Sequence, residues 1–338
     1  MNLRLIAAVA LSVSSLLAQS TAPVSVIPTA SRPAANWQYS RVGDLDGVKA
    51  VTKLSDRMLR GAQPDGAAGM ESLKKLGVKT ILSVEEPDLN ETEAAKAAGI
   101  AMRNVATEYS GLPKPVIDKL VAAYRDLDGT TYVHCHHGKH RGGAAVAVFR
   151  MTFEGFSSDE AISEMFELGC SPRYKGLYET IATYRPDPAV AHRPLAAKDG
   201  LANLVEITPR VYRATGTTGD AALKAAKELG VTRIVLVNGD DATAEKVRAA
   251  GFDATVFAAP SAFTAVTAGA AKSVLDVTGA DKLLVLGSDL ASTSAVIAGW
   301  RLVRSKWTGE EAAKEVEALV GKDGAALATA LRAYVPAK

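Results

Sequence analysis

The sequence predicts an α/β protein of two tandem domains, each a three-layer unit with a mostly parallel central sheet flanked by helices. Three observations lead to this prediction. The chain has 338 residues, enough for two domains of ordinary size, each with its own core. Apolar segments typical of strands alternate with segments of helical spacing, a pattern that favours parallel strand pairs. The second half of the chain also repeats stretches of the first half.

Composition places the chain among ordinary soluble proteins. Hydrophobic residues make up 48% of it and charged residues 22%. The formal net charge is only +2, so no overall field favours nucleic acid or an anionic membrane as a partner. Any preference for anions must therefore come from a local site.

The alternation is clearest in the first half. Strands are predicted at residues 57–61, 78–84, 100–106 and 130–134, and helices at residues 67–77, 91–99, 114–127 and 142–153. Gly77 follows the first helix, where glycine is a common C-terminal signal. The last strand leads into a glycine-containing loop and then into an apolar helix, so this loop lies at one edge of the sheet.

The repeat consists of two gap-free matches in the same order. Residues 59–82 align with residues 212–235, and residues 144–165 align with residues 295–316. Such an arrangement predicts an internal duplication, with one domain per copy. Extending the second match backwards sets Leu286 opposite Cys135 and Ser292 opposite Arg141. The C-terminal copy has therefore lost the reactive residues of the loop described below.

The remaining segments suggest how the chain is processed and divided. Residues 1–20 resemble a signal peptide, with Arg4 before an apolar stretch and small residues at its end. That stretch is shorter than the roughly 20 residues that span a bilayer. We therefore expect a periplasmic or secreted protein with no stable membrane insertion after cleavage. Residues 21–36 are predicted to be a flexible leader, residues 37–185 the catalytic domain, residues 186–200 a proline-containing linker, and residues 201–338 the degenerate copy.

The loop "VHCHHGKHRGG" carries the predicted chemistry. Cys135 and Arg141 have the spacing C-x5-R between a strand and a helix. Backbone amides of such a loop and the start of the helix form a site for an anion such as phosphate. Arg141 can bind two phosphate oxygens, and the same field favours the thiolate of Cys135. A thiolate below a phosphate can attack phosphorus to form a cysteinyl-phosphate, which water then hydrolyses.

This loop resembles the H-C-x-x-G-x-x-R signature of cysteine-based protein tyrosine and dual-specificity phosphatases. His134, Cys135, Gly138 and Arg141 match it position by position. The upstream stretch "MLRGAQPDGAAGMESLKKLGVKTILSV" resembles the opening of compact bacterial and fungal dual-specificity-like members. The resemblance implies a phosphatase-like fold and phosphoric monoester hydrolysis. By it, Cys135 is the nucleophile, Arg141 the phosphate clamp and His134 a residue that orients the thiol and helps keep it ionised.

Two positions depart from the family pattern. Gly142 stands where most members have Ser or Thr, whose hydroxyl assists breakdown of the phosphoenzyme, so the second step is expected to be slow. The family places an aspartate, as general acid, on a loop that here reads "ATEYSGLPKP". Glu108 is the nearest carboxylic acid and is the candidate. Asp118 follows this loop but is expected to face outward from the next helix.

The variable loop positions bear on the substrate. His136, His137, Lys139 and His140 are expected to ring the pocket mouth, while Gly138 and Gly142 complete the phosphate-binding loop. Lys139 has a fixed charge, and the histidines gain charge as the pH falls. Such a rim suits phosphorylated small molecules such as inositol phosphates better than a lone phosphotyrosine. Alternatively, these side chains are merely solvated.

Other kinds of function remain open. A non-catalytic phospho-ligand binder could use the same loop, and a rhodanese-like sulfurtransferase also has a loop that starts with cysteine. A metal site is disfavoured, because adjacent ligands on a tight loop diverge and Lys139 and Arg141 repel a cation. We therefore expect no metal and no cofactor. Cys170 is interpreted as a small buried residue, with a reversible disulfide to Cys135 as the alternative.

Overall fold

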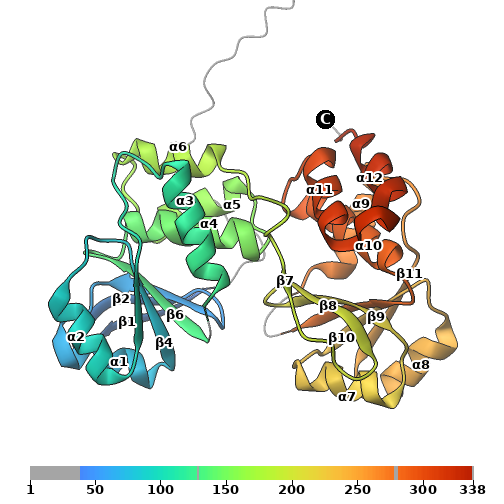
Figure 1. Ribbon diagram of the computed structural model, residues 1–338, viewed down its shortest axis with the longest axis horizontal. Coiled ribbons are helices and arrows are strands. Elements are labelled where there is room, and N and C mark those ends of the chain that lie inside the picture. The colour runs from blue at the N-terminus through green and yellow to red at the C-terminus, as the bar shows by residue number, and fades with distance from the viewer. Residues whose placement is uncertain (1–38, 128, 278–280, 337–338) are drawn as a thin grey trace, which may run out of the picture.

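The computed structural model describes residues 39–127, 129–277 and 281–336. It confirms the predicted fold class: the chain forms two α/β halves, each with a six-stranded, mostly parallel sheet. In each half, one group of helices lies on one side of the sheet and a second group on the other (Figure 1). Within these ranges, no helix combines the length and the apolar composition needed to cross a membrane. The predicted signal peptide and leader lie outside the described residues.

The first half contains the predicted catalytic segment. Its elements are β1 (Ser40–Leu45), β2 (Val48–Lys53), β3 (Met58–Ala62), α1 (Gly66–Lys75), β4 (Val78–Ser83), α2 (Leu89–Ala98), β5 (Ala101–Asn104), α3 (Lys114–Arg125), β6 (Thr130–Cys135), α4 (Arg141–Phe153), α5 (Ser158–Glu167) and α6 (Lys175–Thr183). The strand order is β1-β2-β3-β6-β4-β5, and β3, β6, β4 and β5 are parallel to one another. Strand β6, which leads into the Cys135 loop, is therefore central.

The second half follows the same plan. Its elements are β7 (Arg193–Pro194), β8 (Leu201–Thr208), β9 (Val211–Gly216), α7 (Asp220–Glu228), β10 (Arg233–Val237), α8 (Asp241–Ala249), β11 (Asp253–Phe257), α9 (Ala265–Leu275), β12 (Leu283–Gly287), α10 (Leu290–Arg304), α11 (Gly309–Val320), η1 (Gly321–Gly324) and α12 (Ala325–Arg332). The order β7-β8-β9-β12-β10-β11 repeats the first sheet strand for strand.

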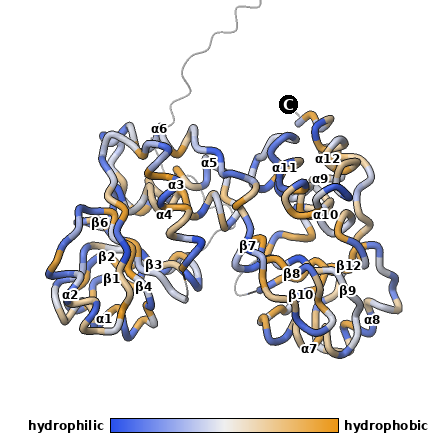
Figure 2. Tube along the Cα trace, viewed as in Figure 1, coloured by the Kyte–Doolittle hydropathy of each residue, from blue (hydrophilic) through white to orange (hydrophobic). Residues whose placement is uncertain are grey.

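Alternate residues of the central strands feed two separate cores. Tyr132 and Ile81 pack under α1 and α2, whereas their neighbours Val133 and Leu82 pack under the opposite helices. This is the period-two alternation of a strand that is covered on both faces. Hydrophobic residues accordingly follow the central strands and α4 (Figure 2). The cores hold the loop after β6 on a rigid base.

Each half contains a buried ion pair at the same place in its fold. Arg150 of α4 binds Glu164 of α5 at 2.6 Å, and Arg301 of α10 binds Glu315 of α11 at 2.9 Å. In both halves the two partners are 14 residues apart. The helices that carry the two glutamates, α5 and α11, also both begin with a capping box, at Ser157 and at Thr308. These matches support the predicted duplication.

The predicted elements occur within a few residues of the observed ones, but β1 and β2 are absent from the prediction. Strand β1 is exposed over nearly its whole length. It therefore lacks the apolar alternation by which a half-buried strand is recognised. The segment of residues 186–200 connects the halves, yet it packs on the second one. Ala191 and His192 are buried, and Arg301 Nη2 donates to the Ala191 carbonyl at 2.9 Å.

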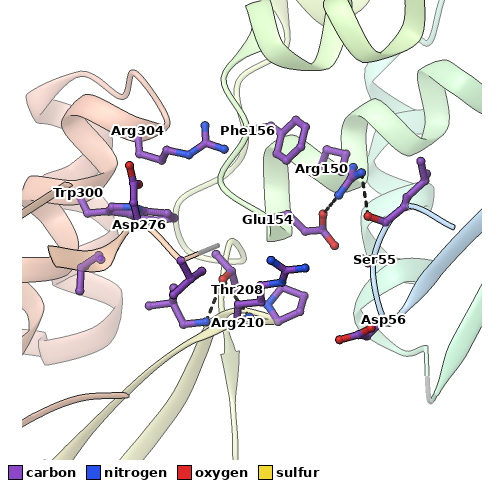
Figure 3. Close-up of a pocket in the computed structure, with 15 residues that line it drawn as sticks. Ser55, Asp56, Arg150, Glu154, Phe156, Thr208, Arg210, Asp276, Trp300 and Arg304 are labelled. Atoms are coloured by element: carbon purple, nitrogen blue, oxygen red, sulfur yellow. Dashed lines mark hydrogen bonds and ion pairs between the residues drawn. The ribbon is translucent and has the colours of Figure 1, made fainter. Parts of the chain in front are cut away.

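The halves meet at a mixed polar and aromatic interface (Figure 3). Lys306 pairs with Asp159 at 2.6 Å, and Arg304 pairs with Glu160. Trp300 packs so closely on Gly155 that a Cβ there would lie 2.5 Å from the indole. A cavity of about 90 Å³ lies between the halves at this point, and the described residues that line it include none of the predicted site residues. The candidate chemistry therefore lies elsewhere, at the carboxyl edge of the first sheet.

Candidate active site

The topology of the first sheet brings three loops to the end of β6. Strand β6 lies between β3 and β4, and Cys135 and His134 pair with Ala62 and Ser83, the last residues of those strands. Loops that follow parallel strands meet at one edge, and ligands in such sheets bind at that edge. Cys135 is its last strand residue and is 1% exposed. Arg141 begins α4 directly after the loop, as the C-x5-R spacing predicts.

The loop holds its shape through a glycine and a buried arginine. Gly138 has φ +68°, and a Cβ there would lie 2.1 Å from the Gly61 carbonyl carbon, so only glycine fits. Arg60 Nη2 donates to the carbonyls of Gly138 at 2.8 Å and Lys139 at 3.3 Å. Because the amide of the following residue points opposite to each carbonyl, the N–H groups of Lys139 and His140 point away from Arg60. Arg60 thus fixes loop amides in an orientation suited to an anion.

Arg60 was not predicted to belong to the site. It is buried, and burial lowers its pKa below the ordinary value of an arginine, against the opposing influence of Glu164 and Cys135. The signal was present in the sequence. Arg60 lies in the "MLRGAQP" stretch, and the internal repeat places Arg213 at the equivalent position, where it is also buried.

A carboxylate occupies the anion-binding position of the loop. Arg141 Nη2 donates to both oxygens of Glu85 at 2.5 Å, and Glu85 Oε1 also accepts the backbone N–H of His136. Although burial acts to lower the pKa of Arg141, the neighbouring Glu85 carboxylate raises it above the ordinary value of an arginine. The Arg141 guanidinium also lies over the ring of Tyr109, 4.4 Å from its centroid. The predicted clamp and a loop amide therefore bind an anionic group together.

Glu85 is another residue that sequence reasoning missed. It follows β4 by two residues, so its position at the carboxyl edge could have been inferred from the predicted strand at residues 78–84. Its backbone is anchored on both sides. The Glu85 N–H donates to Ser83 Oγ at 3.3 Å, and its carbonyl accepts from Asn104 Nδ2 at 2.6 Å.

His134 lies behind the loop and is fully buried. Its Nε2 approaches Glu91 Oε1 to 2.7 Å, although neither ring nitrogen has a partner in hydrogen-bond geometry among the described residues. Glu91 Oε2 accepts from Gln63 Nε2 at 3.0 Å. The structure thus places His134 next to Cys135 along the strand, in a position to orient the loop rather than to touch a substrate.

The variable loop residues lie between Cys135 and Arg141 and are mostly at the surface. His136, His137 and Lys139 are exposed and His140 is half-buried. His140 lies against Tyr174 at 4.5 Å between ring centroids. Burial lowers the pKa of His140 below 6.5, and the nearby charges of His137, Arg173 and Lys139 add to this effect. These groups are therefore close enough to influence one another electrostatically.

Glu108 is less well placed than the other candidates. Its side chain is exposed, its carboxylate accepts a hydrogen bond from Ser110 at 3.0 Å, and among the described residues it makes no hydrogen bond to the Cys135 loop. Asp118 points outward, as expected, and pairs with Lys114 at 2.7 Å. Gly142 lies against the nucleophile: a Cβ there would be 3.6 Å from Cys135 Sγ and 3.3 Å from its N.

The two cysteines are unbonded and buried. Burial raises the pKa of Cys170 to about 11, so this thiol stays neutral near pH 7.

The loop between β12 and α10 of the second half differs from the Cys135 loop in what lies at the start of its helix. Asp289 caps α10 by accepting the Ser292 N–H at 2.7 Å, so a carboxylate of the chain itself closes that helix start. In the described part of the chain, no cluster of three or more His, Cys, Asp or Glu side chains is arranged to hold a metal.

No family model matches the sequence. The dual specificity protein phosphatase TpbA of Pseudomonas aeruginosa is 26% identical over 145 residues, which cover 42% of this chain. The chain spans 63% of the length of this curated relative.

Several solved structures are also similar to part of the chain. The crystal structure of P. aeruginosa TpbA has a TM-score of 0.38 at 20% identity and covers 45% of this chain and 92% of its own. The catalytic domain of the PP-IP phosphatase Siw14 of S. cerevisiae has a TM-score of 0.35 at 18% identity, with 46% and 89% covered. PTPMT1 has a TM-score of 0.32 at 20% identity, with 43% and 94% covered. Over about 45% of its length the chain is similar to dual-specificity, cysteine-based phosphatases.

Proposed function

We propose that the first half is an exported, cysteine-dependent phosphomonoester hydrolase. The observation that carries the proposal is the loop between β6 and α4. There Cys135 lies buried at the loop base while Arg141 and the His136 amide bind a carboxylate. A phosphate dianion offers more acceptor oxygens to the same donors than a carboxylate does. Export is supported by the N-terminal sequence alone.

The proposed reaction has two steps. Cys135 Sγ attacks phosphorus, the S–P bond forms, the ester P–O bond breaks, and the leaving oxygen takes a proton from an acid. Water then attacks phosphorus, the S–P bond breaks, and inorganic phosphate leaves while the acid regains its proton. Arg141 binds the equatorial oxygens throughout. Glu108 remains the proposed acid, which requires its loop to turn the carboxylate toward the leaving group.

The rim favours substrates with more than one phosphate. Lys139, His137 and Arg173 lie close enough to His140 to act on it electrostatically, so a second phosphate bound there would meet fixed and pH-dependent positive charge. Among the similar proteins, Siw14 is a PP-IP phosphatase, PTPMT1 was crystallised with PI(5)P, and TpbA with phosphotyrosine. We propose phosphorylated small molecules such as inositol phosphates as substrates, with phosphotyrosine as the simpler alternative.

We further propose that the second half is a degenerate copy of the first. The repeated strand order, the paired Arg–Glu bonds and the gap-free sequence matches support a duplication. The strand register sets Gly287, rather than the expected Leu286, at the position of Cys135. Ser292 stands opposite Arg141 in the sequence match, and Asp289 occupies the helix start. This half would stabilise the first or bind a partner, without hydrolysing phosphate esters.

Hydrolysis of p-nitrophenyl phosphate tests the proposed function. The wild-type protein should release p-nitrophenol, Cys135→Ser should not, and the matched variant Cys170→Ser should retain activity because that thiol is neutral. A second candidate, a non-catalytic phospho-ligand binder, is favoured by Gly142 and by the distant Glu108. It would be supported if wild type and Cys135→Ser both bind inorganic phosphate and neither hydrolyses the ester.

A further inference from the structure

We propose that Glu85 is an internal competitor for the phosphate site, and that it determines which anions the site accepts. The inference rests on the proposed function, because it concerns the same anion-binding loop. Glu85 would fill the site when no substrate is present. A ligand would have to displace its carboxylate before reaching Cys135.

The contacts of Glu85 are those expected of a bound ligand. Its two oxygens share the Arg141 Nη2 donor, and Oε1 also takes the His136 amide of the loop. These are an arginine and a backbone donor of the kind that binds phosphate in such a loop. The side chains of both residues in the pair are largely buried, at 15% exposed for Arg141 and 18% for Glu85. Because the donors are already used, phosphate and the Glu85 carboxylate cannot occupy the site together.

The position of Glu85 in the chain allows this exchange. Its backbone is fixed by Ser83 and Asn104, so the main chain stays in place. Only the side chain has to rotate for the carboxylate to leave. The next residue, Glu86, is exposed and takes no part in these contacts. A competitor on a short tether has a high effective concentration. A carboxylate from solution offers the same two acceptor oxygens as Glu85 and therefore displaces Glu85 poorly. A phosphate dianion, with more charge and more acceptors, can still compete.

A role for Glu85 in positioning Arg141 would have the opposite effect on phosphate affinity. If Glu85 positioned Arg141 for phosphate, its loss would weaken phosphate binding. If Glu85 competes with phosphate, its loss must strengthen phosphate binding. The apparent affinity is lower in the wild type because only the molecules whose site is free of the Glu85 carboxylate can bind phosphate.

The test is calorimetric titration of inorganic phosphate into Cys135→Ser protein, with and without Glu85→Gln. The glutamine has the same shape, so the fold is retained, and a thermal melt verifies this. We expect the Kd for phosphate to fall by about tenfold or more. Glu86→Gln is the matched control, because it removes one carboxylate from the neighbouring position without touching the loop. It should change the Kd by less than about twofold, as expected for an exposed charge.

A second measurement uses the nucleophile itself. In protein with the native Cys135, Glu85→Gln should increase the rate at which iodoacetamide labels the Cys135 peptide, and added phosphate should slow it again. An unchanged or weaker phosphate affinity in Glu85→Gln would overturn the inference, as would tightening of equal size in Glu86→Gln. Neither result would bear on ester hydrolysis by the wild type. Conversely, tighter binding in a protein that hydrolyses no ester would refute the proposed function alone.

Discussion

At the scale of single residues, Gly142 is the clearest departure from the phosphatase pattern. It lies at the start of α4, where a Cβ would lie 3.6 Å from Cys135 Sγ. The same Cβ would lie 3.3 Å from the Cys135 N, so the neighbouring backbone would have to shift by only a few tenths of an ångström. A serine there would place a hydroxyl beside the sulfur that carries the proposed phosphoryl group.

We therefore expect Gly142→Ser to accelerate breakdown of the phosphoenzyme. Assisted proton transfer typically contributes about 10²–10⁴-fold, so a gain of at least about tenfold in the second step is expected. Rapid-mixing kinetics with p-nitrophenyl phosphate measures it. The wild type should show a burst followed by slow turnover, and the variant a smaller burst with a faster steady state. Identical traces would mean that breakdown does not limit the wild type.

Glu108 can be tested through the leaving group. Its replacement by glutamine should leave hydrolysis of p-nitrophenyl phosphate nearly unchanged, because nitrophenolate leaves without a proton. It should slow hydrolysis of an alkyl phosphate by about 10²-fold or more, since an alkoxide needs the proton. Asp118→Asn, a carboxylate on the outer face of α3, is the control. Equal rates for both substrates in Glu108→Gln would remove Glu108 from the reaction.

Single-residue chemistry was predictable only where it is local in sequence. Cys135, Gly138 and Arg141 share one short loop, so their spacing reveals them. Arg60 reaches the same loop from the middle of β3 and Glu85 from the segment after β4, and only the parallel pairing of β3 and β4 with β6 brings them there. Without the strand order, neither contact follows from the sequence.

At the scale of elements, the Cys135 loop depends on β3 as much as on its own residues. Gly138 packs on the backbone of Gly61, and Arg60 binds the loop carbonyls from the same strand. The conformation of the loop therefore depends on two neighbouring strands, which explains how the loop can hold Gly138 in a left-handed conformation three residues after Cys135.

Gly138→Ala should consequently cost more stability than an ordinary glycine replacement. A Cβ at Gly138 would lie 2.1 Å from Gly61, in addition to the strain at φ +68°. We expect a loss of more than about 2 kcal/mol in urea unfolding. Gly99→Ala is the control, because Gly99 has a similar φ of +73° and nothing within 4 Å of its Cβ position. It should lose about 1 kcal/mol. Equal losses would show that the contact with β3 is unimportant.

Element prediction succeeded where burial imposes a period. The strands at β3, β4 and β6 are buried on both faces, and α3 and α4 present apolar positions to the core. Strand β1 is missing from the prediction because its side chains face solvent and follow no apolar pattern. It forms by antiparallel pairing with β2, an interaction between strands that single-segment patterns do not record.

At the scale of the whole molecule, a buried histidine lies where the linking segment packs on the second half. Burial lowers the pKa of His192 below its ordinary 6.5, and Arg301 and Arg213 lower it further against the opposing effect of Glu315. The folded protein thus holds His192 neutral. The unfolded chain takes up a proton as the pH falls below 6.5, so the stability that depends on neutral His192 is present above that pH and is lost below it.

Urea unfolding at pH 7.5 and pH 5.0 measures this loss. The wild type should be less stable at the lower pH, and His192→Gln should lose less over the same interval. The quantity compared is the change in unfolding free energy between the two pH values, so any pH-independent cost of the substitution cancels. If the variant and the wild type lose the same amount, another group is responsible for the pH dependence.

The second half shows that the fold does not depend on its chemistry. The second half has the same strand order and a matching buried Arg–Glu pair, although Gly287, rather than the expected Leu286, ends β12 where Cys135 ends β6. A cysteine at that position is thus not required for a sheet of this strand order.

The most direct test of that function is to trap the intermediate. The protein is mixed with a fast phosphate ester, quenched in acid and digested, and the peptide that contains Cys135 is weighed by mass spectrometry. A cysteine-dependent phosphatase with slow breakdown should carry one phosphoryl group on Cys135, absent from the Cys135→Ser protein. Hydrolysis that proceeds with no phosphoryl group on Cys135, or that survives Cys135→Ser, would contradict the account.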